Sequence, residues 1–91
     1  MIRLNCFLKV DAGHRREVLE AAIRLTAASL EQDGCIAYDI FESATRPDVM
    51  MICETWRDQV ALDAHSASDV FAKEVAVMRS HAEMKLEAFP F

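Results

Sequence analysis

Hydrophobic and polar positions alternate along the first part of the chain. In residues 2–10 the even-numbered positions are apolar and the odd-numbered positions are mostly polar; the apolar set is Ile2, Leu4, Cys6, Leu8 and Val10. A period of two is typical of a β-strand with one buried face. Asp11, Ala12 and Gly13 then interrupt the pattern. We therefore predict a strand over residues 2–10, followed by a turn.

The period changes to that of a helix over residues 14–32. One apolar stripe recurs at helical spacing and charged residues fill the remaining positions; the stripe is Val18, Leu19, Ala22, Ile23, Thr26 and Leu30. We predict that this stripe is the buried face of the helix. Gly34 is expected to close it, because glycine enters the left-handed conformation without steric cost.

The rest of the chain predicts three strands and a broken helix. Residues 35–41 and 49–56 read as a hairpin whose polar loop, residues 43–48, contains a proline. Asp58 can cap a short helix that passes through His65. Residues 66–68 interrupt this helix, and Ser68 or Asp69 starts a second segment. Residues 84–88 alternate again and predict the last strand, which Pro90 ends.

The predicted order, β-α-β-β-α-β, favours an α+β fold: a ferredoxin-like sandwich formed by one domain over residues 1–91. Right-handed crossovers place both helices on one face of an antiparallel sheet and leave the other face uncovered. The residues expected on that uncovered face are Asn5, Phe7, Phe41, Trp56 and Phe89. Because so many aromatic side chains rarely face water, we expect a second copy to cover them, giving a homodimer.

Composition supports burial against a partner and excludes several functions. Hydrophobic residues make up 53% of the 91 positions, above the usual share of about 45–50%. The formal net charge of −5 and the lack of a basic stretch argue against binding to nucleic acid or an anionic membrane surface. No apolar run reaches the length of about 18 residues that spans a bilayer, and the N-terminus lacks a signal-peptide pattern. We expect a soluble cytoplasmic protein.

Several kinds of site lack their sequence patterns. Cys6, Cys35 and Cys53 have no C-x-x-C spacing and are interpreted as reduced core residues. The histidines show no metal-binding spacing, so no metal is predicted; His14 and His81 are interpreted as surface residues at helix ends. With only two glycines, the chain has no glycine-rich loop for a nucleotide cofactor.

His65 is the main candidate for chemistry, because it lies near the helix break and its ordinary pKa is near neutral pH. A hydrogen-bonded structural histidine is the alternative. Glu54 is either an acid that orients His65 or the partner of an arginine. Asn5 either holds a substrate oxygen or faces solvent at a sheet edge. Trp56 and Tyr38 offer flat surfaces for a ring-shaped ligand, or are core aromatics.

Two segments resemble the antibiotic biosynthesis monooxygenase family. Residues 29–38, S-L-E-Q-D-G-C-I-A-Y, are similar to its S-x-x-E-x-G-C-x-x-Y segment, and residues 54–71 resemble its E-x-W … A-L-x-x-H … F segment. The resemblance implies a dimeric α+β barrel with a cavity between each sheet and its helices. It favours the small quinol-monooxygenase-like members.

The resemblance implies a cofactor-independent monooxygenase that oxidises a small phenol or quinol with molecular oxygen. No cofactor is expected, because the deprotonated substrate itself reduces oxygen. His65 and Asn5 would be catalytic, and the substrate-binding residues would be Trp56, Glu54, Tyr38 and Phe71.

Other activities in the family are weighed against this one. The haem-degrading members have a tryptophan where His65 stands and a haem-binding histidine on the last helix, where this chain has residues 75–77, V-A-V. This difference disfavours haem degradation. Two alternatives stay open: a non-catalytic small-ligand-binding or stress-related dimer, and an isomerase of a small carbonyl compound that uses the same pocket.

Overall fold

The computed structural model describes residues 1–90; Phe91, the last residue of the predicted domain, lies outside the described residues. The elements follow the order β1 (Ile2–Val10), α1 (Arg15–Leu30), β2 (Cys35–Glu42), β3 (Val49–Trp56), α2 (Gln59–Ser66), α3 (Asp69–His81) and β4 (Ala82–Pro90). This order, with the second helix broken into α2 and α3, confirms the predicted ferredoxin-like α+β fold.

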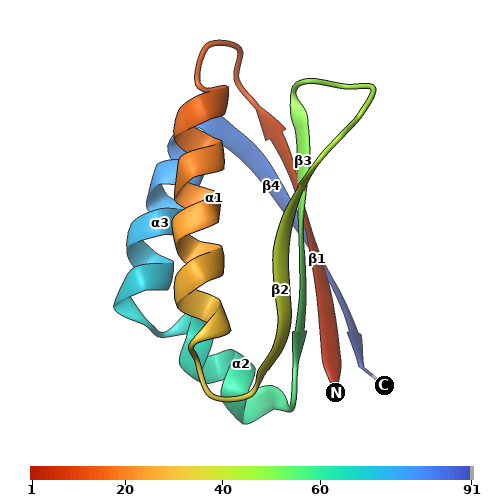
Figure 1. Cartoon of the computed structure of the whole chain (residues 1–91), viewed down its shortest axis with the longest axis vertical. Helices are drawn as coiled ribbons and strands as arrows, with labels where there is room; N and C mark the ends of the chain where they lie inside the picture. The colour runs from red at the N-terminus through yellow and green to blue at the C-terminus, as the bar shows by residue number, and fades with distance from the viewer. Residues whose placement is uncertain (91) are drawn as a thin grey trace.

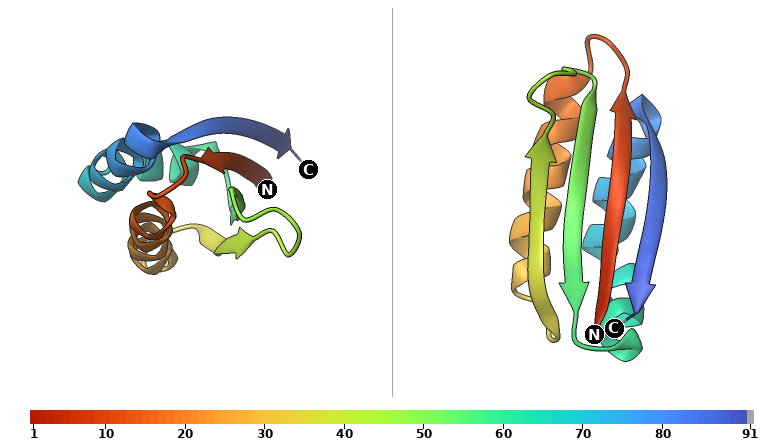
Figure 2. Two further views of the ribbon diagram at one scale, coloured as in Figure 1. Left: turned by 90° about the horizontal axis from the view of Figure 1, so that it is seen from above. Right: turned by 90° about the vertical axis from the view of Figure 1, so that its right-hand side faces the viewer.

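The four strands form one antiparallel sheet in the order β2-β3-β1-β4. All three helices lie on one face of the sheet, and no helix covers the other face within residues 1–90 (Figures 1 and 2). We call this uncovered side the open face. The register places Leu4 of β1 opposite Glu54 of β3 and Ala88 of β4, so each residue's face follows from the pairing.

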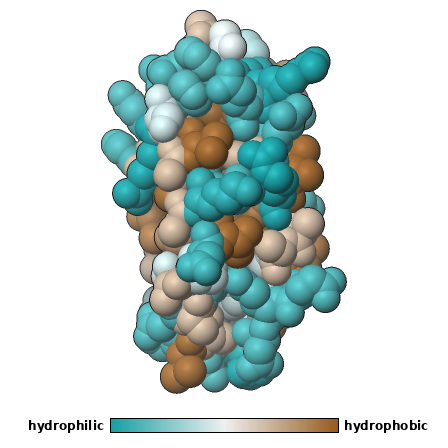
Figure 3. Space-filling view, turned by 90° about the vertical axis from the view of Figure 1, so that its left-hand side faces the viewer, coloured by the Kyte–Doolittle hydropathy of each residue, from teal (hydrophilic) through white to brown (hydrophobic). Residues whose placement is uncertain are grey.

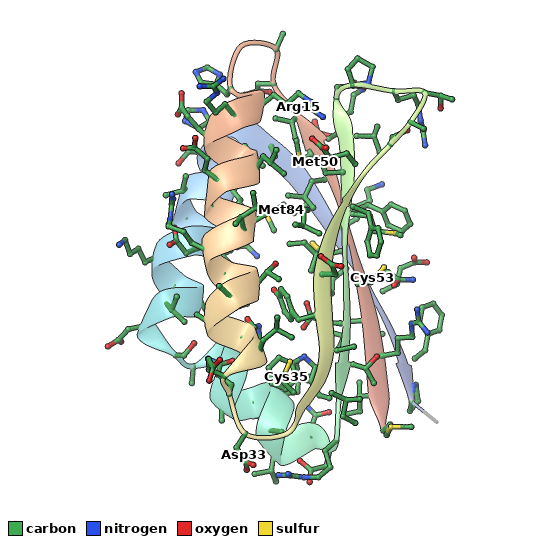
Figure 4. All side chains as sticks on the ribbon, in the orientation of Figure 1. Arg15, Asp33, Cys35, Met50, Cys53 and Met84 are labelled. Atoms are coloured by element: carbon green, nitrogen blue, oxygen red, sulfur yellow. The ribbon has the colours of Figure 1, made fainter. Side chains whose placement is uncertain are left out.

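The core fills the space between the sheet and the helices. Met50 and Met84 point into this space, whereas Cys53 lies on the opposite side of β3 (Figure 4). Leu4, Cys6, Leu8 and Val10 of β1 are all buried, as their alternation predicts. The outer surface of the helices is mostly hydrophilic, with separate hydrophobic areas (Figure 3). No helix in the described residues is long and apolar enough to cross a membrane.

The buried face of α1 differs from the predicted stripe. The buried residues are Val18, Ala21, Ala22, Leu25 and Ser29, whereas Ile23 and Leu30 are about half exposed, at 51% and 52%. The helix is therefore rotated relative to the prediction. The predicted stripe includes Val18 and Ala22 but misses Ala21, Leu25 and Ser29, two of which have small side chains that allow α1 to pack closely.

Two side-chain caps fix the break between α2 and α3. The Asp58 carboxylate accepts a hydrogen bond from the backbone N–H of Ala61, at 2.9 Å, and begins α2. The Ser68 hydroxyl accepts from the N–H of Phe71, at 3.3 Å, and begins α3. Both caps agree with the sequence prediction. They hold His65 near the end of the short helix α2.

The open face carries most of the aromatic residues predicted there. Phe7, Phe41 and Phe89 are 43%, 50% and 45% exposed. The prediction for Trp56 is wrong: its side chain is completely buried and lies on the helix side of β3, together with Glu54. Alternation along β3 puts these two residues on one face, and that face is the covered one.

Candidate functional site

A cavity of about 120 Å³ lies between the sheet and the helices. Its walls are mostly apolar, and the part formed by α2, α3 and β4 consists of Leu62, Phe71, Val75, Met78, Met84 and Leu86. Arg79 of α3 and Leu86 of β4 also line the cavity, and both are exposed to solvent. We therefore place the entrance between α3 and β4.

Four of the predicted site residues line this cavity. Tyr38, Glu54 and His65 form a polar group within it, and Phe71 contributes to its apolar wall. Trp56 does not line the cavity, but its ring lies against His65, with 4.5 Å between the ring centroids. Strands β2 and β3 bring Tyr38 beside Glu54, because the two residues pair directly across the ladder.

Asn5 lies on the other side of the sheet from this cavity. It pairs with Cys53 of β3 and Glu87 of β4, whereas its neighbours Leu4 and Cys6 face the helices. Its Oδ1 is buried and has no hydrogen-bond partner within residues 1–90. The structure therefore does not bring Asn5 together with His65.

His65 is buried and uses its two ring nitrogens differently. Its side chain is 1% exposed. Nδ1 lies 2.7 Å from Oε1 of Gln32, at the loop that follows α1. Nε2 is buried with no hydrogen-bond partner within residues 1–90, and lies 4.0 Å from Oε1 of Glu54. Nε2 is thus the nitrogen nearer to Glu54, a residue that also lines the cavity.

The neighbours of His65 determine its tautomer. The Ser68 hydroxyl donates its single proton to the backbone carbonyl of His65, at 2.7 Å, so it can only accept from Gln32. The Gln32 Nε2 amide group is 3.4 Å from that hydroxyl, which turns Oε1 of Gln32 towards His65. An amide oxygen only accepts hydrogen bonds, so Nδ1 carries the proton and Nε2 of the neutral ring has a free lone pair.

Aromatic rings surround the imidazole and exclude water from it. Besides Trp56, the rings of Phe71 and Tyr38 lie 5.1 and 5.6 Å from the His65 ring, centroid to centroid. Burial in these surroundings lowers the pKa of His65 to about 4, because a charged imidazolium loses its hydration there. His65 is therefore neutral at pH 7.

Glu54 is a buried carboxyl group next to two polar aromatic side chains. The indole N–H of Trp56 donates a hydrogen bond to Oε1 at 2.9 Å, and the hydroxyl of Tyr38, which pairs with Glu54 across the ladder, also favours the charged carboxylate. Burial raises the pKa of Glu54, and the two donors offset part of that effect because they stabilise the charged form. Burial, followed by the charge of Glu54, also raises the pKa of Tyr38, which keeps its hydroxyl protonated.

Cys6 and Cys35 are poor nucleophiles. None of the three forms a disulfide in the described residues. Cys6 lines the cavity, but burial, followed by the charge of Glu54, raises the pKa of its thiol to about 11. Cys35 is half-buried, and burial raises its thiol pKa as well. Because the thiolate is the reactive form, these thiols do not replace His65 as the reactive group.

The cavity offers few ligands for a metal. Cys6, Glu54 and His65 line it, but their ligand atoms do not all come within 4.8 Å of one another in residues 1–90, as the three protein ligands of a catalytic zinc ion would. Apolar side chains and a neutral imidazole suit a small, mostly apolar molecule with one acidic O–H group. The site can bind such a molecule away from water and accept its proton at Nε2.

Sequence reasoning missed Gln32. It occupies the fourth position of the family-like segment of residues 29–38, where the family pattern has glutamate and this chain has glutamine. Gln32 is far from His65 in sequence, and nothing local indicates that its amide fixes the histidine tautomer. The contact exists because the turn containing Gly34 brings the end of α1 beside α2.

Comparisons with known proteins agree with the fold and identify the family. The sequence model of the antibiotic biosynthesis monooxygenase family matches residues 1–77. YcnE of Bacillus subtilis (strain 168), named as a candidate monooxygenase, is 32% identical over 76 residues. That match covers 84% of this chain and 80% of YcnE.

Solved structures extend the comparison. A protein of unknown function from Bacteroides thetaiotaomicron VPI-5482, described as a candidate oxidoreductase, is 53% identical with a TM-score of 0.97. The match covers 99% of this chain and 96% of that one. SnoaB of Streptomyces nogalater, a cofactor-independent oxygenase, is 16% identical with a TM-score of 0.88, covering 99% and 91% of the two chains, and shares the fold.

Proposed function

This chain belongs to the antibiotic biosynthesis monooxygenase family, and on that premise we propose that it oxidises a single-ring phenol or quinol with molecular oxygen. Family membership supports a monooxygenase-type function. The size of the cavity limits the substrate to a small molecule: it measures about 120 Å³, slightly less than the apolar cavity of about 150 Å³ that holds one benzene molecule. A polycyclic substrate needs more room than this.

The free lone pair on Nε2 of His65 carries the proposal. A buried nitrogen without a partner is costly unless a ligand completes its hydrogen bonding. A phenol hydroxyl in the cavity would donate to it. The low pKa of the free imidazole disfavours its protonation. Proton transfer therefore depends on the attraction between the imidazolium and the phenolate, which form together in the bound complex.

Glu54 supports this transfer by its position. Its Oε1 lies 4.0 Å from Nε2, close enough to stabilise the imidazolium once the proton has moved. Trp56 holds the carboxylate in place through its indole N–H. His65 is thus the acid–base group, Glu54 its electrostatic partner and Phe71 part of the wall against which the substrate ring packs.

The proposed reaction converts a phenol and O2 into a quinone and water. His65 takes the phenolic proton, and the electron-rich phenolate gives one electron to O2. The resulting superoxide and aryloxyl radical combine through a new carbon–oxygen bond, and the imidazolium returns its proton to the peroxide. Loss of the ring C–H proton and cleavage of the O–O bond release water and leave the second carbonyl. The substrate supplies all the electrons.

The test is oxygen uptake with a panel of single-ring phenols and hydroquinones, with His65→Gln compared with the wild type. We expect uptake by the wild type and a fall in kcat of about 100-fold or more in the variant, the usual contribution of a general base. His81→Gln is the matched control, because it changes a histidine at the far end of α3 and should keep full activity. Reactions without protein measure autoxidation of the substrate.

Each other result contradicts a stated part of the proposal. Uptake retained in His65→Gln removes His65 from the mechanism. Binding of the phenol without oxygen uptake favours the ligand-binding alternative; quenching of Trp56 fluorescence measures that binding. Isomerisation of a small carbonyl compound without oxygen consumption favours the isomerase.

A further inference from the structure

The fold brings together two histidines that are far apart in the sequence. His14 caps the start of α1 and His81 ends α3, and their rings stack with centroids 4.0 Å apart and planes inclined by 8°. Asp11, in the turn after β1, lies beside them. One potential metal-binding atom from each of the three residues lies within 4.8 Å of the others.

Backbone hydrogen bonds hold this cluster in place. The N–H of Asp11 donates to the carbonyl of His81 at 2.7 Å, and the N–H of His14 donates to the carbonyl of Asp11 at 3.2 Å. The three residues come from separate segments, but the backbone fixes their relative positions. The side chains therefore converge without a long, flexible loop.

The hydrogen bonding of the two imidazoles leaves atoms for a ligand. Nδ1 of His14 is buried and has no hydrogen-bond partner within residues 1–90. Nε2 of His81 lies 3.2 Å from a carboxylate oxygen of Glu17. Histidines that bind metals usually direct their second nitrogen to a carboxylate in this way, which fixes the ring and strengthens the ligand.

We propose that Asp11, His14 and His81 bind a divalent transition-metal ion, with zinc as the best match, and that Glu17 orients His81. Two imidazole nitrogens and one carboxylate oxygen are ligands that zinc accepts, with water completing four-coordination. The ion would join the turn after β1 and the start of α1 to the end of α3.

Metal binding requires a small local rearrangement. Zinc–ligand bonds of about 2.0–2.2 Å place the ligand atoms closer together than the 4.8 Å limit seen here, so the side chains must close around the ion. The two rings must also tilt apart, because a metal lies in the plane of each imidazole that binds it. His14 caps α1 without a side-chain hydrogen bond, so its ring can turn without loss of a cap.

This site is independent of the proposed oxidation. It lies at the end of the sheet where α1 begins, whereas α2, which carries His65, lies at the opposite end (Figure 1). The ion would stabilise this end of the fold. Removal of the metal should therefore lower the thermal stability of the protein and leave oxygen uptake unchanged.

The experiment measures zinc binding to the whole chain by calorimetry, with the absorption spectrum of bound Co²⁺ as a second readout. We expect one ion per chain, lost in both His14→Gln and His81→Gln. His65→Gln is the matched control and should bind like the wild type. Glu17→Gln should bind at least about tenfold more weakly, as expected for a residue that orients a ligand.

Three outcomes would overturn the proposal. The wild type could fail to bind zinc. Binding could persist in both His14→Gln and His81→Gln, which would assign the ion to other ligands such as the cysteines. Equal loss of binding in His65→Gln would move the site to the cavity. Folding of each variant is checked by circular dichroism, so that unfolding is not mistaken for loss of a ligand.

Discussion

At the scale of single residues, Gln32 controls the chemistry available to His65. Its amide oxygen accepts from Nδ1, which leaves Nε2, the nitrogen nearer to Glu54, with a free lone pair. Ser68 determines the direction of that amide, because its own proton is already given to a backbone carbonyl. In the proposed mechanism Gln32 is thus a positioning residue, which would act on the substrate only through His65.

Two substitutions of Gln32 test this role. Gln32→Leu removes the acceptor for Nδ1 and leaves a buried N–H unpaired, so we expect kcat to fall about tenfold at constant KM, comparable to the usual cost of such a group. Gln32→Glu places a carboxylate at Nδ1 and should raise the pKa of His65, moving the acidic limb of the kcat/KM profile to higher pH. Equal, pH-independent losses in both variants would indicate a merely structural role.

The buried imidazole also predicts how stability changes with pH. The folded pKa of His65, about 4, is below the unfolded value of 6.5, so the unfolded state binds more protons between these values. The stabilising contribution is complete above pH 6.5 and is lost as pH falls towards 4. Urea unfolding should therefore show a loss in the free energy of unfolding of up to about 3 kcal/mol over this range.

His65→Gln provides the comparison, because glutamine does not titrate. The difference in unfolding free energy between the wild type and this variant should change with pH only below pH 6.5. Glu54 contributes in the opposite sense. Because its pKa is raised in the folded state, it adds to the free energy of unfolding at low pH, and this contribution is lost as pH rises. A pH-independent difference between the two proteins would contradict a depressed pKa for His65.

At the scale of elements, the turn between α1 and β2 fixes the position of α2. Gly34 has φ +80°, and a Cβ atom there would overlap the Cβ of Ala61 in α2. The backbone N–H of Arg57 donates to the carbonyl of Gly34 at 2.8 Å. This close approach brings Gln32 beside His65, so the glycine contributes to the site as well as to the turn.

Gly34→Ala is therefore expected to destabilise the protein more than Gly13→Ala. Gly13 also has a positive φ, of 88°, but a Cβ atom there would meet nothing within 4 Å. We expect a loss of about 1–2 kcal/mol for Gly13→Ala from the backbone alone, and about 1–3 kcal/mol more for Gly34→Ala from the overlap. Urea unfolding measures both.

Gly34→Ala should also reduce oxygen uptake, because α2 must shift, whereas Gly13→Ala should leave uptake unchanged. Equal free energies of unfolding for the two variants would show that α2 can shift away from residue 34 without destabilising the protein. In that case the close contact between the turn and α2 would not determine the geometry of the site.

At the scale of the whole molecule, the open face predicts association between two copies of the chain. Phe7, Phe41 and Phe89 are all at least 43% exposed on this face. A stable interface buries about 1,200–2,000 Å² in total, which two sheets packed together would supply. The apolar share of the composition is consistent with such a buried face.

The dimer prediction is tested by sedimentation. The wild type should sediment as a dimer at micromolar concentration, and Phe41→Glu should shift it towards monomer by placing a charge in the interface. Ile23→Glu is the matched control: Ile23 is 51% exposed on α1, on the other side of the molecule, and its replacement should leave the dimer intact. A monomeric wild type would contradict the prediction.

The sequence by itself determined the elements and their order. Alternation identified β1 and its buried face, and the polar side chains of Asp58 and Ser68 marked the starts of α2 and α3. These signals are local, since a strand's period and a cap's hydrogen bond involve residues a few positions apart. The family-like segments added His65, Glu54, Tyr38 and Phe71, which the structure finds around one cavity.

Only the tertiary structure decided which faces meet. It turned Leu25 and Ser29 of α1 inward instead of Ile23 and Leu30, and put Trp56 on the covered side of the sheet. It also set Asn5 apart from the cavity, paired Gln32 with His65 and stacked His14 on His81. These relations join residues that are distant in sequence, and they follow from packing and backbone pairing across the whole chain, which no local pattern records.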